Sequence, residues 1–434
     1  MIHNEAYRKK MQWFINDRFG MFIHWGLYAI PARGEWVRCE ERISAEKYNK
    51  YFEEFNPTAY DPKEWARLAK KAGMKYTVLT AKHHDGFCLF DSKLTDYSST
   101  NTKCKRDLVR EYIEAFRAEG LKVGLYYSVI DWHHPDYPHY GDRFHPMSCN
   151  EKIKDTIHDF DNYLCYMHGH VRELCTNYGK IDIMWFDFSY DDMIGEKWKS
   201  IELVSMARSL QPHLIIDNRL SVNSMGTDFF KPKADNAIGD FTTPEQFIPV
   251  NGIFDDEGNR AVWEACVTMN NSWGYNETDR YFKPPEMIIR KLVECVSKGG
   301  NMLLNVGPDA RGRFPRQSVE TLESVGEWMS RNSESIYNCG YAGIDKPETG
   351  RITSKPGKVY YHIMESPVGG YIELSGLKKE EIVKVRMLSS GAELELVNDL
   401  MTNNYSEPFI SLGNDPVLPD PYDTVIEVEA NSSV

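Results

Sequence analysis

The sequence lacks the patterns that mark several common classes of protein. Its nine cysteines are scattered over 434 residues and form no C-x-x-C pair, so we expect neither a zinc ribbon nor a disulfide framework. It has no run of about 18 apolar residues and no apolar leader at its start. We therefore expect no membrane insertion, and a cytoplasmic location for the chain as it stands, or a periplasmic or secreted one if a signal peptide was removed.

The chain also lacks an excess of positive charge. The chain has 51 Lys and Arg against 64 Asp and Glu, a formal net charge of -13, with no cluster of basic residues. This balance argues against nucleic acid or an anionic membrane as the main partner. Neither G-x-G-x-x-G nor G-x-x-x-x-G-K-[ST] occurs, which disfavours a nucleotide-binding open sheet.

Helix and strand patterns alternate along roughly the first 335 residues. Asp61-Pro62 begins a helix, Gly73 ends it, and the apolar run at 76–80 follows as a buried strand. The unit recurs, with further strands predicted at 20–26, 122–128, 181–187, 214–218 and 302–308. This alternation favours an α/β fold of the (β/α)8-like TIM barrel type, with an open doubly wound sheet as the alternative.

The pattern changes after about residue 340. Short apolar or alternating segments lie between Gly, Pro and Asn turns and predict an antiparallel β-sandwich; they are 359–363, 371–374, 382–387, 393–396 and 424–428. We therefore divide the chain into a barrel catalytic domain, residues 1–340, and a C-terminal β-sandwich accessory domain, residues 341–434.

Polar side chains recur where the predicted parallel strands end, which is where ligands bind in such folds. They are His24, His83, His84, Tyr126, Asp187, Arg219 and Glu245. Asp187 stands out, because Trp185-Phe186-Asp187 places a carboxylate on the same strand face as a tryptophan. A buried carboxylate needs a partner, such as Arg219, or a chemical role as nucleophile or base.

A chemical role for Asp187 calls for a second carboxylate. Retaining glycoside hydrolysis uses two carboxyl groups about 5 to 5.5 Å apart, one as nucleophile and one as proton donor. Spacing along the chain does not choose among the candidates, which are Glu35, Asp240, Glu245 and Glu264.

A second histidine cluster contains His133, His134, His139 and His145. It has no H-E-x-x-H motif or regular ligand spacing, and its segment is rich in Pro, Tyr and Asp. We interpret it as a loop at the rim of the barrel rather than as a metal site.

Several ordered motifs resemble the α-L-fucosidases of glycoside hydrolase family 29. They cover the predicted barrel in order, to about residue 340, and the trailing β-domain has that family's layout. The motifs are Arg18-Phe19-Gly20-Met21-Phe22-Ile23-His24-Trp25-Gly26, Lys82-His83-His84-Asp85-Gly86-Phe87, Gly124-Leu125-Tyr126-Tyr127-Ser128, Trp185-Phe186-Asp187, Ser272-Trp273-Gly274-Tyr275-Asn276 and Gly299-Gly300-Asn301-Met302-Leu303-Leu304-Asn305-Val306-Gly307-Pro308.

The resemblance implies an exo-acting retaining enzyme that removes terminal L-fucose from glycans and uses no metal or cofactor. Its nucleophile falls on Asp187 and its acid/base on Glu245, with Glu264 as the alternative. Arg219 is expected to keep Asp187 ionised, and a drier setting to keep Glu245 protonated. The fucose-binding residues carried over by motif are His24, Glu35, Trp36, His83, His84, Tyr126, Trp185, Arg219 and Trp273.

Two other functions stay open at this point. One is a catalytically inactive protein that binds fucose on the same scaffold, and the other is a metal-dependent barrel hydrolase that uses His83, His84 and Asp187. The expected partners are fucosylated oligosaccharides or glycoconjugates. Linkage preference, which depends on the loops at 130–149 and 247–261, and assembly into a homo-oligomer are left undetermined by the sequence.

Overall fold

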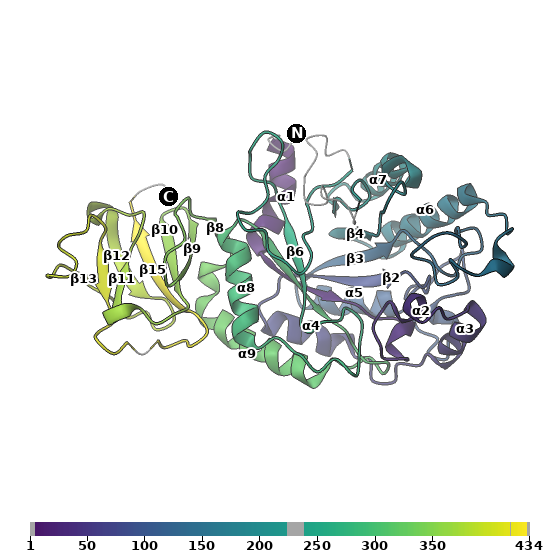
Figure 1. Cartoon of the computed structure of the whole chain (residues 1–434), viewed down its shortest axis with the longest axis horizontal. Coiled ribbons are helices and arrows are strands. Elements are labelled where there is room, and N and C mark those ends of the chain that lie inside the picture. Colours follow the sequence, from purple (N-terminus) through teal and green to yellow (C-terminus); the bar gives the residue numbers. More distant parts are fainter. Residues whose placement is uncertain (1–4, 224–237, 417, 432–434) are drawn as a thin grey trace.

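The computed structural model describes residues 5–223, 238–416 and 418–431, and the larger part of it is built around a curled parallel sheet (Figure 1). Within the described residues, seven strands pair in the order β5-β4-β3-β2-β1-β7-β6, each parallel to its neighbours. The strands are β1 (Phe19–Ile23), β2 (Tyr76–Lys82), β3 (Lys122–Ser128), β4 (Ile183–Asp187), β5 (Ile215–Ile216), β6 (Glu264–Thr268) and β7 (Asn301–Val306).

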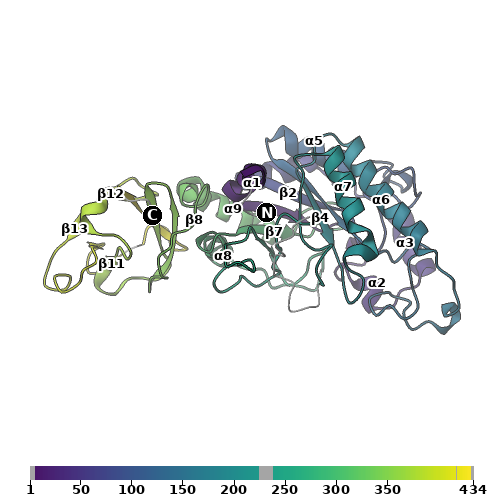
Figure 2. The same cartoon turned by 90° about the horizontal axis from the view of Figure 1, so that it is seen from above.

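Helices connect these strands and cover the outside of the sheet (Figure 2). The larger ones are α1 (Glu5–Asp17), α4 (Pro62–Lys71), α5 (Leu108–Ala118), α6 (Phe160–Asn177), α7 (Ser200–Leu210), α8 (Pro285–Ser297) and α9 (Arg316–Asn332); α2 (Val37–Glu40) and α3 (Ala45–Glu54) lie in the loop after β1. The predicted start of α4 is confirmed: Asp61 accepts hydrogen bonds from the backbone N–H groups of Lys63 and Glu64, and Pro62 occupies the first turn.

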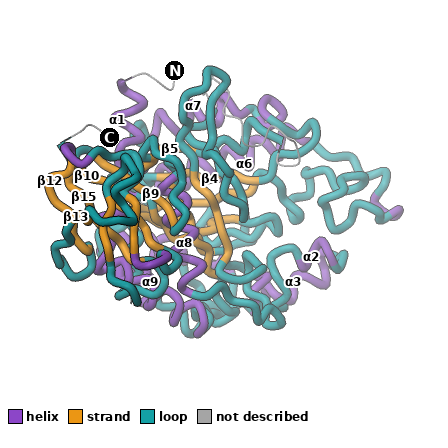
Figure 3. Tube along the Cα trace, turned by 60° about the vertical axis from the view of Figure 1, so that its left-hand side comes forward, coloured by secondary structure: helices purple, strands orange, loops and turns teal. Residues whose placement is uncertain are grey.

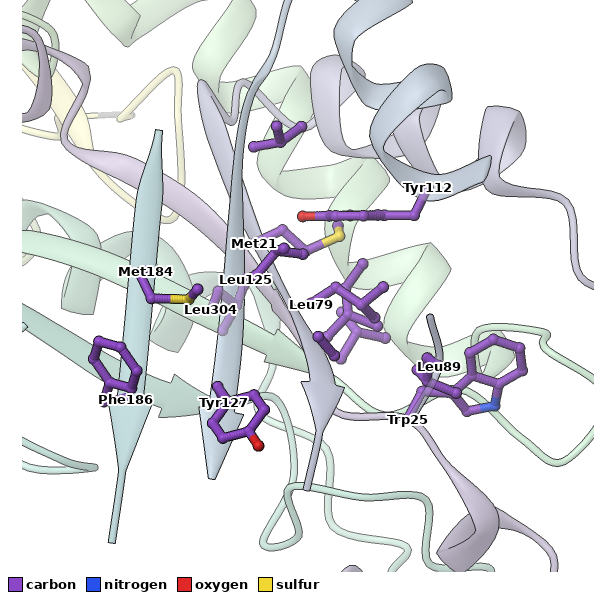
Figure 4. Close-up of a cluster of buried hydrophobic side chains, with 14 of the residues drawn as sticks. Met21, Trp25, Leu79, Leu89, Tyr112, Leu125, Tyr127, Met184, Phe186 and Leu304 are labelled. Carbon is purple, nitrogen blue, oxygen red and sulfur yellow. The ribbon is translucent and has the colours of Figure 1, made fainter. Parts of the chain in front are cut away.

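The two faces of the sheet follow the period of two along each strand. One face packs against the helices and carries aliphatic and sulfur-containing side chains such as Met21, Leu79, Leu125 and Leu304 (Figure 4). The other face lines the inside of the curled sheet and carries aromatic rings, among them those of Phe22, Tyr76, Tyr126 and Trp185. On β4 this alternation sends Trp185 and Asp187 inward.

The prediction of a TIM barrel is confirmed in part. Among the described residues the sheet has seven regular strands rather than eight, and its edge strands are β5 and β6. Residues 240–245 run between these edges and pair with their neighbourhood through isolated bridges, Asp217 with Phe241, Thr242 with Trp263 and Glu245 with Cys266. The prediction also missed β6, whose five residues contain no long apolar run.

The C-terminal part of the chain contains two antiparallel sheets, as predicted, and several of their strands are labelled in Figure 3. Among the described residues, one sheet has the order β12-β15-β10-β9-β8 and the other β11-β14-β13. Their bounds are β8 (Gly340–Tyr341), β9 (Gly350–Lys355), β10 (Lys358–Ile363), β11 (Tyr371–Glu373), β12 (Ile382–Met387), β13 (Leu396–Val397), β14 (Phe409–Ser411) and β15 (Thr424–Ala430). Side chains from both sheets, including Tyr361, Ile372, Ile410 and Ile426, share one core.

The antiparallel sheets also pack against helices of the first part. The indole N–H of Trp328 on α9 donates to the carbonyl of Asp423, and Arg290 on α8 donates to that of Tyr422. No described helix is long and apolar enough to cross a membrane. The boundary at residue 340 stays a prediction.

Candidate active site

A cavity of about 720 Å³ opens where the parallel strands end. This volume lies in the range of small-molecule sites, about 300 to 1,000 Å³. Apart from the alternative acid/base Glu264, the residues that the resemblance nominates for catalysis or sugar binding all line the cavity, namely His24, Glu35, Trp36, His83, His84, Tyr126, Trp185, Asp187, Arg219, Glu245 and Trp273. The structure thus gathers these side chains in one place; their individual roles stay predictions.

Asp187 ends β4 with both carboxylate oxygens occupied. The Tyr126 hydroxyl on the neighbouring strand donates to Oδ2 over 2.8 Å, and Nη1 of Arg219 donates to Oδ1 over 2.7 Å. The side chain keeps 12% of its surface exposed, on the cavity side. Two donors, one of them charged, stabilise negative charge on this carboxylate and fix its orientation.

Arg219 joins the two candidate catalytic carboxylates. While Nη1 contacts Asp187, Nη2 donates to Oε2 of Glu245 over 2.9 Å, and Nε donates to the Thr243 hydroxyl over 2.9 Å. The guanidinium carbon lies 4.4 Å from the ring centroid of Trp185. Burial opposes the charge, but Asp187 and Glu245 raise the pKa of Arg219, so the cation persists at every physiological pH.

The expectation of a drier setting for Glu245 is wrong. Its side chain is 37% exposed, against 12% for Asp187, and it is ion-paired with the same Arg219. The segment 240–245, which runs between the edge strands, ends with Glu245 in the cavity lining, where solvent reaches its side chain. Burial therefore does not separate the roles of the two carboxylates.

The hydrogen bonds of two site histidines define their tautomers. The Nδ2 amide of Asn305 donates to the carbonyl of Trp273, so its Oδ1 must accept from Nδ1 of His24, 2.7 Å away. The Ser128 hydroxyl donates to the carbonyl of Ile130, so its oxygen must accept from Nδ1 of His84, 2.7 Å away. In both rings Nε2 is left as an acceptor.

Burial keeps these histidines neutral. It lowers the pKa of His24 to about 3 and the pKa values of His83 and His84 well below the usual range. The three rings lie close together, with centroids 4.0 Å apart for His83 and His84 and 5.6 Å apart for His24 and His83. Together they present neutral ring nitrogens, suited to hydroxyl groups rather than to anions.

Glu35 is the buried carboxyl group of the cavity. Its Oε2 accepts a hydrogen bond of 2.8 Å from the backbone N–H of Gly274, which orders the loop that carries Trp273. Burial raises the pKa of Glu35 to about 7. At neutral pH this carboxyl group is therefore present in both protonation states.

Glu264, the alternative acid/base, lies outside the cavity lining. It is the first residue of β6, so it sits at the amino end of the parallel sheet, whereas the cavity is at the carboxyl end. Its carboxyl group is fully buried and accepts a hydrogen bond from the Tyr76 hydroxyl. The nomination of Glu264 is corrected for this reason.

Sequence reasoning did not nominate several residues of the lining, namely Phe22, Cys39, Glu40, Phe144, Phe188, Gln246, Phe247 and Cys266. Phe22 and Phe188 lie within two residues of nominated positions. Phe144 and Phe247 come from the two loops expected to affect linkage, but nothing in their local sequence marks them.

The rim histidines do not line the cavity. His133 stacks on Tyr97 with centroids 3.7 Å apart, and His139 lies over His145 at 4.4 Å. Across the described residues, no group of three or more His, Cys, Asp or Glu side chains is arranged to hold a metal ion.

Comparison with known proteins points to one family. The family model for α-L-fucosidase matches residues 2–334. The α-L-fucosidase of Dictyostelium discoideum is 28% identical over 421 residues, covering 86% of this chain and 85% of that protein. The tissue α-L-fucosidase of Homo sapiens is 28% identical over 415 residues, covering 89% and 82%.

Solved structures agree with this result. The α-L-fucosidase isoenzyme 1 from Paenibacillus thiaminolyticus has a TM-score of 0.94 and 56% identity, covering 98% of this chain and 100% of that chain. A trapped covalent intermediate of a family 29 α-L-fucosidase from Bacteroides thetaiotaomicron, in complex with 2-fluoro-fucosyl fluoride, has a TM-score of 0.83 and 30% identity, covering 98% and 96%.

Proposed function

Because the chain belongs to the α-L-fucosidase family and is a glycoside hydrolase, we propose that it releases terminal L-fucose from fucosylated glycans by a retaining double displacement. The observation that carries this proposal is the shared contact of Arg219 with Asp187 and Glu245. Two carboxylates within reach of one guanidinium group fit the short separation, about 5 to 5.5 Å, that retention requires.

In the first displacement an Asp187 oxygen attacks the anomeric carbon of fucose. The glycosidic bond breaks as Glu245 transfers its proton to the leaving oxygen, and a fucosyl ester of Asp187 forms. In the second, Glu245 takes a proton from water, the water oxygen bonds to the anomeric carbon, and the carboxylate of Asp187 is released. The covalent intermediate described for the Bacteroides thetaiotaomicron enzyme supports this sequence by analogy.

Arg219 and Tyr126 assist both steps. Asp187 loses its negative charge as the ester forms and regains it when the ester is hydrolysed. The hydrogen bonds from Arg219 and Tyr126 to its oxygens weaken in the first step and strengthen again in the second. They also hold the attacking oxygen in one direction, which lowers the entropic cost of the attack.

Recognition of the sugar fits the tautomers of the site. The free Nε2 atoms of His24 and His84 accept hydrogen bonds from fucose hydroxyls, and Glu35 can accept or donate because its pKa is about 7. The ring of Trp273, which packs 5.0 Å from His24 and 6.0 Å from Phe22, offers an apolar surface to the C5 methyl group.

Azide rescue tests the two catalytic assignments. Asp187→Ala should abolish hydrolysis of an aryl fucoside, and azide should restore turnover with β-fucosyl azide as the product, because one displacement inverts the anomeric centre. Glu245→Ala should instead yield α-fucosyl azide, because two displacements retain it. Near wild-type hydrolysis by Asp187→Ala would contradict the mechanism.

Leaving groups of different basicity separate Glu245 from Glu35 as the proton donor. An aryl fucoside with a very acidic phenol needs no proton from the enzyme. The variant that lacks the acid should therefore form the fucosyl-enzyme at a near-normal rate with that substrate and slowly with a basic leaving group. We expect this pattern for Glu245→Gln; the same pattern for Glu35→Gln, and not for Glu245→Gln, would move the role to Glu35.

A further inference from the structure

An exposed phenylalanine lies at the mouth of the cavity, two residues after Glu245. Phe247 is 84% exposed and yet contributes to the cavity lining. An aromatic ring held in water at the edge of a binding cavity offers apolar surface to a ligand. Its neighbour Glu245 is the proposed proton donor to the leaving group, so the ring lies on the side where the leaving group departs.

The backbone between these two residues is held in a tight turn. Gln246 has a φ of 61°, a left-handed conformation that costs a residue other than glycine free energy. Its backbone N–H donates to the carbonyl of Cys266 over 2.9 Å, and its side-chain oxygen accepts from the N–H and hydroxyl of Thr268 at 3.3 and 3.2 Å. The N–H of Phe247 then donates to the carbonyl of Glu245 over 2.7 Å.

This turn fixes Phe247 relative to Glu245. The backbone N–H and the side-chain oxygen of Gln246 both form hydrogen bonds with residues of β6, a fully buried strand of the sheet. These bonds hold the left-handed backbone conformation of Gln246 in place. A loop that only needed to connect two elements would not require such anchoring.

The charges around the cavity restrict what can bind there. Four carboxyl groups line it, those of Glu35, Glu40, Asp187 and Glu245, and among the described lining residues Arg219 is the one Lys or Arg. Because Arg219 is engaged by Asp187 and Glu245, it leaves no excess of positive charge. An anionic leaving group would meet net repulsion.

We propose that Phe247 forms the leaving-group site and takes an uncharged pyranose of the glycan, whose apolar ring face stacks on the phenyl group. This inference rests on the proposed function, because it assumes that Glu245 faces the leaving oxygen. It makes Phe247 a determinant of specificity for the leaving group rather than of the bond-breaking chemistry.

The test compares two substrates that share fucose and differ in the leaving group. One is a fucosyl-α-galactose disaccharide, and the other is methyl α-L-fucoside, whose alkoxide leaving group needs the same proton from Glu245 but has no ring to stack. Phe247→Ala should lower kcat/KM for the disaccharide about tenfold more than for the methyl fucoside, and Phe247→Tyr should restore the wild-type ratio of the two values. Phe254, a 40% exposed phenylalanine of the same loop outside the cavity lining, provides the control variant Phe254→Ala, which should keep the wild-type ratio.

Equal losses on both substrates would overturn the proposal, because they would show that Phe247 only positions Glu245. An unchanged kcat/KM on both substrates in Phe247→Ala would overturn it as well. Failure of the wild-type protein to hydrolyse either fucoside would instead refute the proposed function itself.

A second comparison tests the charge of the leaving group. Replacing the galactose by galacturonic acid at the same linkage should lower kcat/KM, and the loss should shrink in Glu40→Gln and at high salt. A preference for the acidic sugar would contradict a leaving-group site for neutral sugars.

Discussion

Glu264 allows a quantitative test of the interior of the sheet. Burial raises the pKa of this carboxyl group from 4.5 to about 8, so the folded protein retains its proton at pH values where the unfolded chain has lost it. Between pH 4.5 and 8 the folded state binds more protons, and stability must fall as pH rises. Replacing Glu264 by glutamine removes this titration and keeps the size of the side chain.

The magnitude follows from the pKa difference. A difference of one pKa unit corresponds to about 1.36 kcal/mol. Because the folded protein must keep a proton that the unfolded chain has lost, Glu264 lowers the free energy of unfolding of the wild-type protein by about 4 kcal/mol at pH 7.5 and by less than about 1 kcal/mol at pH 5. The free energy of unfolding of Glu264→Gln, relative to wild type, should therefore increase by about 3 kcal/mol between pH 5 and pH 7.5.

Urea unfolding at the two pH values measures this difference, because contributions from all other groups cancel between the two proteins. Glu64→Gln, on the exposed surface of α4, is the control and should show no such change. A relative stability that is the same at both pH values would show that Glu264 is ionised in the folded protein and would refute the reasoning. Glu264 lies outside the cavity lining. The kcat of Glu264→Gln on an aryl fucoside should therefore stay within about threefold of wild type, as expected for a residue that takes no part in the chemistry.

Two further predictions concern single contacts. Tyr126→Phe removes the hydroxyl that donates to Asp187, and since hydrogen bonds to charged groups contribute about 1.5 to 3 kcal/mol, kcat on an aryl fucoside should fall about 10- to 100-fold; an unchanged kcat would contradict the contact. Lys82→Met leaves the buried carboxylate of Asp131 without its ion-pair partner 3.0 Å away, which should cost about 3 to 5 kcal/mol of stability in urea unfolding. Adding Asp131→Asn should recover part of that loss.

Much of the fold could be predicted because local signals agree with it. Capping by Asp61, followed by Pro62 and ended at Gly73, defines α4 without reference to the rest of the chain. The alternation along β4 likewise assigns Trp185 and Asp187 to one face. The strand β6 was missed because it is only five residues long and its sequence has no periodic pattern. Its place in the sheet depends on pairing with β7, which lies more than 30 residues later.

The site could be predicted as a set but not in its internal arrangement. Ordered motifs, each at the end of a strand, were enough to nominate the residues that share the cavity, because the carboxyl ends of parallel strands converge. Motifs do not reveal that Gln246 takes up a left-handed turn, or that this turn places Phe247 beside the cavity.

The sequence by itself determined the alternation of strands and helices and the clustering of polar groups at one end of the sheet, because these depend on local periodicity and on strand direction. Only the tertiary structure placed Glu245 in the cavity lining and Glu264 at the amino end of β6, outside it. It also decided the exposure of Glu245 and its sharing of Arg219 with Asp187. Burial and charge pairing arise from residues far apart in the chain, and no local pattern encodes them.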